Sequence, residues 1–145
     1  MYKEDAMYLN QLSVFLENRE GRLDQVLECL KNNNVNIISL SLADTSDYGM
    51  LRMIVSNPEA AKAALKAAGF SAMLTPVIGM KLGHKAGSLQ GALSAICKEG
   101  INVEYMYALA TSGDDAIIVV KTTDLDKSAA ALEKAGVALA KAEEI

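Results

Sequence analysis

The sequence has few residues of the kinds that hold a disulfide framework or a metal ion. Its 145 residues include two cysteines and one histidine. Cys29 and Cys97 lie far apart, no CxxC pair occurs, and His84 has no partner at metal-ligand spacing. We therefore expect buried, reduced thiols, and we expect neither a zinc site nor any other metal or cofactor.

Positive charge is also sparse. The chain carries 14 Lys and Arg against 18 Asp and Glu, for a formal net charge of −4, and it has no basic block. Nucleic acid is therefore not expected as a partner. No apolar run approaches the roughly 20 residues that span a bilayer, and the polar start MYKED lacks the apolar core of a signal peptide. We expect no membrane association and a cytoplasmic location.

An internal repeat organises the sequence. A shift of 66 residues places Gly21 on Gly87, and a shift of 67, after one inserted residue, places Leu42 on Leu109. A period of this size indicates the duplication of a domain, because the repeats of the usual solenoids are shorter.

Each copy has the pattern strand, helix, strand, strand, helix, strand. After the extended run LSVFL, the residues Leu23, Val26, Leu27 and Leu30 recur at helical spacing. VNIISLSLA and MLRMIV then flank the turn sequence TSDYG, and INVEYMYALA and AIIVV flank TSGDD in the second copy. Both pairs of segments are predicted to form hairpins.

The second helix of each copy has recognisable ends. Asn57 and Asp124 are of the residue types that cap helix N-termini. The Ala-rich stretches that follow them stop at Gly69 and Gly136, and glycine tolerates the left-handed conformation common after a helix.

The order βαββαβ is typical of the ferredoxin-like fold. We predict an α+β protein of two ferredoxin-like βαββαβ repeats packed side by side, with antiparallel sheets and helices on one face. The two domains are predicted at residues 1–75 and 76–145. Because no linker separates them, the last strand of one copy and the first strand of the next should meet at Pro76. Sheets joined edge to edge would hide two exposed strand edges.

The loops before the first helix of each copy are candidate binding sites. Gly21 and Gly87 lie where strand passes to helix, each two residues after a basic residue, Arg19 or Lys85. A helix N-terminus carries unpaired N–H groups and attracts an anion such as a carboxylate. The alternative interpretation is that each glycine only makes a tight turn and that the charged side chains are solvated.

The segments ENREGRLDQVLECLKNNNVNI and GHKAGSLQGALSAICKEGINV resemble the first loop and helix of ACT domains, which are small regulatory modules that bind amino acids. The resemblance extends from about residue 9 to residue 141, and the chain is similar to stand-alone tandem ACT proteins. It implies a non-catalytic regulatory protein with a free amino acid as its ligand. It also implies a metabolic enzyme as a regulated partner, and a homodimer.

In this family the ligand lies at the junction of two domains, between the loop of one and an asparagine of the other. The resemblance therefore implies one site at loop 18–23 with Asn102 and another at loop 84–89 with Asn36. Glu20 and Ala86 stand where the family has proline, and His84 takes the place of Asn18, so the two sites should not be chemically equal. The implied ligand-binding residues are Asn18, Arg19, Glu20, Gly21, Arg22, Leu23, Asn36, His84, Lys85, Ala86, Gly87, Ser88, Leu89 and Asn102.

Other functions remain open at this point. An acylphosphatase-like enzyme needs an arginine and an asparagine around a phosphate, and Arg19 with Asn36 are the candidates. A ligand-free interaction subunit would instead assemble through its sheet edges. His84 has no partner at a spacing that suggests a nucleophile for it to activate. Asn36 and Asn102 could equally bond the backbone where a strand begins.

Overall fold

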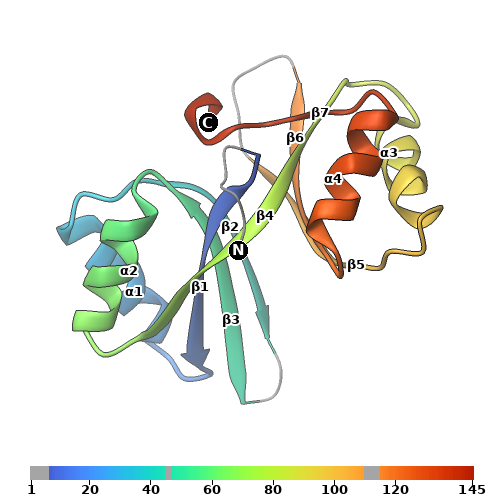
Figure 1. The fold of residues 1–145 in the computed structure, drawn as a ribbon. Coiled ribbons are helices and arrows are strands. Elements are labelled where there is room, and N and C mark those ends of the chain that lie inside the picture. The colour runs from blue at the N-terminus through green and yellow to red at the C-terminus, as the bar shows by residue number, and fades with distance from the viewer. Residues whose placement is uncertain (1–6, 45–46, 110–114) are drawn as a thin grey trace. The chain divides into compact units, whose positions relative to one another are not determined.

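The chain packs into two units (Figure 1). The first unit is Asn10–Thr75, and the second unit is Pro76–Ile145 together with the described residues that precede Asn10. The computed structural model describes residues 7–44, 47–109 and 115–145. The turn sequences TSDYG and TSGDD lie partly outside the described residues. None of the described helices is both long enough and apolar enough to cross a membrane.

The first unit is an antiparallel sheet with two helices. Its elements are β1 (Leu9–Glu17), α1 (Arg22–Asn32), β2 (Ile37–Asp44), β3 (Tyr48–Val55), α2 (Pro58–Ala67) and the first part of β4 (Ser71–Leu82). The strand order is β2-β3-β1-β4. This order and the βαββαβ sequence of elements confirm the predicted ferredoxin-like repeat.

The second unit repeats this plan. It contains the rest of β4, then α3 (Ser88–Cys97), β5 (Val103–Leu109), β6 (Ala116–Thr122), α4 (Leu125–Lys134), β7 (Ala138–Leu139) and a short 3-10 helix, η1 (Ala142–Glu144). Met80 and Lys81 pair with both β6 and β7, so these strands lie on opposite edges of β4. The order is therefore β5-β6-β4-β7, the same as in the first unit.

Both helices of the first unit cover one face of its sheet. Leu12 and Val14 of β1 are buried in the same cluster as Leu30 of α1 and Leu65 of α2. Successive side chains of a strand point to opposite faces, so residues two apart share a face. The core of this unit therefore lies between the sheet and the helix pair.

The second unit has a core of its own. Met80 of β4 packs there with Ile96 of α3 and Leu132 of α4, and Tyr8 joins the same cluster. The Tyr8 hydroxyl donates a hydrogen bond to the carboxylate of Asp126 at the start of α4. The chain therefore passes from the second unit into the first within β1.

The predicted ends of α2 and α4 are confirmed. The side chains of Asn57 and Asp124 each accept a hydrogen bond from the backbone N–H three residues later, at 3.2 and 3.0 Å. Gly69 and Gly136 follow the helices with φ of +91° and +82°. Glycine is needed at these two positions because other residues rarely adopt a positive φ.

The two strands expected to meet at Pro76 form one continuous strand, β4. Pro76 has no N–H to donate, so it is poorly tolerated inside a hydrogen-bonded ladder. The pairing of β4 with β6 begins at Ile78, so the proline lies ahead of that ladder. The edge-to-edge joining of the two sheets stays a prediction.

The prediction of buried thiols is wrong for Cys97. Its side chain is exposed, whereas Cys29 is half-buried, and both thiols are free. The repeat explains the difference, because Cys97 takes the position that exposed Lys31 holds on α1. This position faces outward in both helices.

An ion pair holds the C-terminal turn of the second unit. The ammonium group of Lys81 donates to the carboxylate of Glu144, which also accepts a hydrogen bond of 2.7 Å from the backbone N–H of Lys141. Both bonds favour the charged form, and the bond from Lys81 is the larger cause of a pKa lowered from the ordinary value. This stabilisation is fully present above the ordinary carboxyl pKa and is lost as pH falls through the lowered pKa.

We expect Lys81→Gln to raise the pKa of Glu144 toward its ordinary value. Side-chain carboxyl shifts in an NMR titration would measure the midpoint. Lys134→Gln removes the same charge from the exposed end of α4 and should leave the midpoint unchanged. A Glu144 pKa that responds equally to both substitutions would show that the Lys81 contact is not its cause.

Candidate functional site

The loop from β1 to α1 and the loop from β4 to α3 share a backbone conformation. Gly21 and Gly87 are the N-cap residues, with φ of +88° and +87°. A Cβ added at either glycine would meet nothing within 4 Å, so glycine is needed for the conformation and not for space. This observation supports the tight-turn interpretation of the two glycines.

The helices α1 and α3 nevertheless differ from the other two at their N-termini. No side chain caps α1 or α3, whereas Asn57 and Asp124 cap α2 and α4. The first N–H groups of a helix have no acceptor within that helix. In α1 and α3 the first of these groups donates within the preceding turn, from Arg22 to the carbonyl of Arg19 at 3.4 Å and from Ser88 to the carbonyl of Lys85 at 3.2 Å, and no side chain caps the N–H groups that follow.

A pocket of about 350 Å³ lies beside the first loop. The end of β1, the loop, the first turn of α1 and the β2–β3 hairpin contribute its walls. The backbone N–H of Asn18 donates to the carbonyl of Asp47 at 2.9 Å, which fixes the loop against that hairpin. The lining residues are Leu16, Glu17, Asn18, Arg19, Leu23, Leu42 and Gly49.

The second loop has an equivalent pocket of about 320 Å³. Most residues that line it are the repeat equivalents of residues that line the first pocket. His84 takes the place of Asn18, and Lys85 takes the place of Arg19. The lining residues are Leu82, Gly83, His84, Lys85, Ser88, Leu89, Ala116 and Ile118. The duplicated sequence thus produces two pockets of similar size.

Arg22 is directed away from the first pocket. Its Nη1 donates to Gln25 at 2.7 Å, and its guanidinium lies 4.4 Å from the ring centroid of Phe70. Its Nε lies 3.6 Å from Glu17 Oε1 and, among the described residues, has no hydrogen-bond partner. Arg22 therefore supports the loop instead of lining the pocket.

The structure brings only part of each predicted set to a pocket. Asn18, Arg19 and Leu23 line the first pocket, and His84, Lys85, Ser88 and Leu89 line the second. Glu20, Gly21, Arg22, Ala86 and Gly87 do not line either one.

Asn36 and Asn102 lie at the far ends of α1 and α3 from these loops. Their backbone N–H groups donate to Ser56 Oγ at 2.9 Å and to Thr123 Oγ1 at 3.2 Å. These bonds use the backbone of the asparagines and not their side chains, so a bond from either side chain to the backbone stays a prediction. The pairing of each asparagine with the loop of the other copy stays a prediction.

The placement of Asn36 also weighs against an acylphosphatase-like site. Arg19 precedes α1 and Asn36 follows it, and the 11 residues of α1 span about 16 Å. Within the first unit these two residues therefore lie at opposite ends of α1, which does not favour a shared phosphate site.

Four lining residues of the first pocket were missed from the sequence: Leu16, Glu17, Leu42 and Gly49. Leu16 and Glu17 directly precede loop 18–23, and this position was the signal available in the sequence. Leu42 and Gly49 become neighbours of the loop only through the pairing of β3 with β1 and β2. The motif alone carries no information on that pairing.

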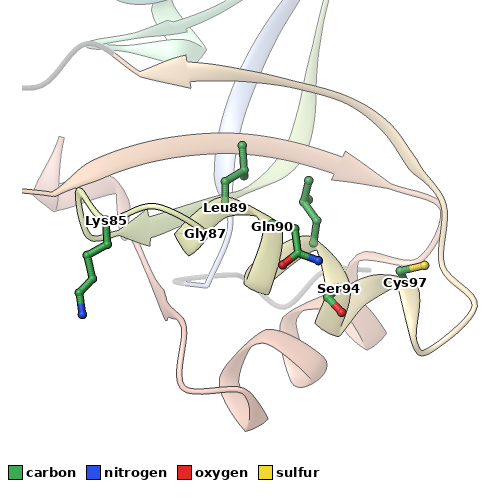
Figure 2. A pocket seen from close by; sticks show the side chains of 7 residues that line it. Lys85, Gly87, Leu89, Gln90, Ser94 and Cys97 are labelled. Atoms are coloured by element: carbon green, nitrogen blue, oxygen red, sulfur yellow. The ribbon is translucent and has the colours of Figure 1, made fainter.

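The second unit also has a groove along α3, of about 660 Å³ (Figure 2). Lys85 and Leu89 line both this groove and the second loop pocket. α3 carries no charged residue, whereas α1 carries both signs of charge. The groove residues are Lys85, Gly87, Leu89, Gln90, Leu93, Ser94 and Cys97.

Solved structures with a similar fold include regulatory subunits of aspartate kinase. Protein BT0572 from Bacteroides thetaiotaomicron is 38% identical, with 97% of each chain covered and a TM-score of 0.90. The ligand-free regulatory subunit of aspartate kinase from Thermus thermophilus is 16% identical, with 90% of this chain and 93% of that one covered and a TM-score of 0.61. The corresponding subunit from Thermus flavus is also 16% identical, with 88% and 94% covered and a TM-score of 0.56.

No curated protein matches the chain. The family model for an ACT domain pair matches residues 7–142, which is nearly the whole sequence. The loop motifs, the two βαββαβ units and this match agree, and the chain belongs to the ACT domain pair family.

Proposed function

We propose that the protein is a non-catalytic regulator that binds a free amino acid at the loops before α1 and α3. The observation that carries this proposal is the contrast between the helices. α1 and α3 begin without a side-chain cap and beside a pocket, whereas Asn57 and Asp124 cap the other two. Uncapped N–H groups at the positive end of a helix suit a carboxylate.

The first pocket has the groups that an amino acid requires. The amide oxygen of Asn18 can accept a hydrogen bond from an ammonium group. Leu16, Leu23 and Leu42 provide apolar walls for a side chain. Volumes of about 320 and 350 Å³ lie at the small end of ligand pockets, which span about 300–1,000 Å³, and they favour a single amino acid over a nucleotide.

The regulated partner is proposed to be a metabolic enzyme. Proteins of similar fold include regulatory subunits of aspartate kinase, which supports a regulatory role for this chain. We propose that it acts as a homodimer in the cytoplasm and signals by binding the ligand more tightly in one arrangement than in another. Such a difference in affinity shifts the population toward the favoured arrangement.

Thermal unfolding against each of the common amino acids tests the proposal. A ligand that binds only the folded protein stabilises it by about 2.7 kcal/mol at a hundredfold excess over Kd, which raises the Tm of a small protein by several degrees. We expect one chemical class of amino acid to raise the Tm. If no amino acid changes the Tm, the proposed ligand is wrong.

Asn18→Ala should weaken binding of the identified amino acid about two- to tenfold, because a typical hydrogen bond contributes about 0.5–1.5 kcal/mol net. Calorimetric titration would measure the change. Asn32→Ala is the matched control, because it removes the same side chain from the exposed end of α1. Equal losses in the two variants would exclude Asn18 from the site.

A further inference from the structure

The two loop pockets have similar volumes but different charge. Glu17 and Arg19 line the first pocket, and Gly83 and Lys85 hold the equivalent positions in the second. Among the described residues that line the second pocket, none is acidic. Their similar volumes give no reason for a difference in ligand binding, whereas their different charge does.

In the first pocket, one carboxylate oxygen is shared by two guanidinium groups. Glu17 Oε1 lies 3.3 Å from Arg19 Nη2 and 3.6 Å from Arg22 Nε. Of the two arginines only Arg19 lines the pocket, so a carboxylate that enters it meets the negative charge of Glu17 and competes with Glu17 for Arg19. This competition weakens the binding of any anionic group there.

The second pocket lacks this competition. Gly83 has no side chain, and Ser88 stands where the first copy has Arg22. Within the part of the chain that the structure describes, Lys85 forms no ion pair. Its positive charge therefore remains available to an incoming carboxylate.

We propose that Glu17 determines the relative affinity of the two pockets by competing with the carboxylate of the ligand, so that the pocket at loop 84–89 fills at a lower concentration. The proposal rests on the proposed function in placing the ligand at the two loops. The side chains of Glu17 and Arg19 are 62% and 64% exposed. Exposed ion pairs are weak, so we expect a difference of about two- to fivefold in the binding midpoint.

An NMR titration of the full chain with sodium acetate tests the competition. Sodium chloride replaces acetate in the reference titration, so that the ionic strength is the same in both. The backbone amides of Gly21 and Gly87 report on the two loops separately. In the unsubstituted protein, the Gly87 signal should reach its midpoint at a lower acetate concentration than the Gly21 signal.

Glu17→Gln should lower the Gly21 midpoint about two- to fivefold and leave the Gly87 midpoint unchanged. Glu20→Gln is the matched control, because it removes the same charge from the same loop, yet Glu20 lines neither loop pocket and forms no ion pair among the described residues. Equal shifts in the two variants would overturn the proposal, because general electrostatics would then explain them. An unchanged or higher Gly21 midpoint in Glu17→Gln, a reversed order of filling, or no acetate response at one of the loops would overturn it as well.

A parallel titration with the amino acid from the thermal screen separates this proposal from the proposed function. If that amino acid shifts both loops while Glu17→Gln has no effect, the function stands and the competition fails. If no amino acid shifts either loop but acetate fills them in the expected order, the competition stands and the function fails.

Discussion

Leu65→Ala is expected to lower the free energy of unfolding by about 2–5 kcal/mol, because it leaves a cavity under α2. Leu65 is fully buried in the core of the first unit. Leu132 holds the equivalent place under α4 and is fully buried in the other core, so Leu132→Ala should have an effect of similar size. Urea denaturation followed by circular dichroism would measure both losses.

Hydrogen exchange would show which unit each substitution destabilises. Because the two leucines belong to separate clusters, Leu65→Ala should speed exchange mainly in residues 10–75, and Leu132→Ala mainly in residues 76–145. Leu65→Met nearly conserves volume and should cost less than about 1.5 kcal/mol. If either Leu→Ala variant speeds exchange equally in both units, the cores are energetically coupled and the predicted division into two domains is wrong.

Thr122→Val should destabilise the protein by about 1–3 kcal/mol, because it leaves a buried hydroxyl without its partner. Thr122 Oγ1 and Ser128 Oγ lie 2.7 Å apart, and both residues are almost fully buried. At the equivalent positions the first unit holds Val55 and Ala61, which have no polar side-chain atoms. The same fold therefore accommodates an apolar pair here.

The double variant Thr122→Val, Ser128→Ala should consequently be close to the unsubstituted protein in stability. A double-mutant cycle from urea denaturation measures this coupling, with each single variant as the reference for the other. Ser128→Ala alone should also destabilise, because it leaves the Thr122 hydroxyl unpaired. Losses that simply add in the double variant would show that the two hydroxyls do not depend on each other.

Local sequence patterns predicted the elements of this fold well. The helical spacing of Leu23 and Leu30 and the caps at Asn57 and Asp124 all depend on neighbouring residues, and the structure confirms them. The continuity of β4 could not be predicted in this way. In the sequence, Pro76 indicates a break between two strands. Whether one strand can continue through this proline depends on its pairing with distant strands, and the ladder with β6 begins only at Ile78.

The candidate site was predictable only as far as its loops. Asn18 and Lys85 come from the motif itself, and both line pockets. Arg22 belongs to the same motif, but it packs against Phe70, which lies far away in sequence and reaches the loop only through tertiary packing. A motif therefore locates a loop, and the packing around it decides which side chains remain available to a ligand.

The continuity of β4 also has a consequence for the alternation of side chains at the junction of the two copies. Because strand side chains alternate between faces, a single residue inserted or deleted between Thr75 and Pro76 would reverse the facing of every later residue in the strand. The residues of β4 that belong to the two core clusters or pack against them are even-numbered, namely Ala72 and Leu74 in the first unit and Ile78, Met80 and Leu82 in the second. A change in length of two residues at the junction would preserve this alternation along β4.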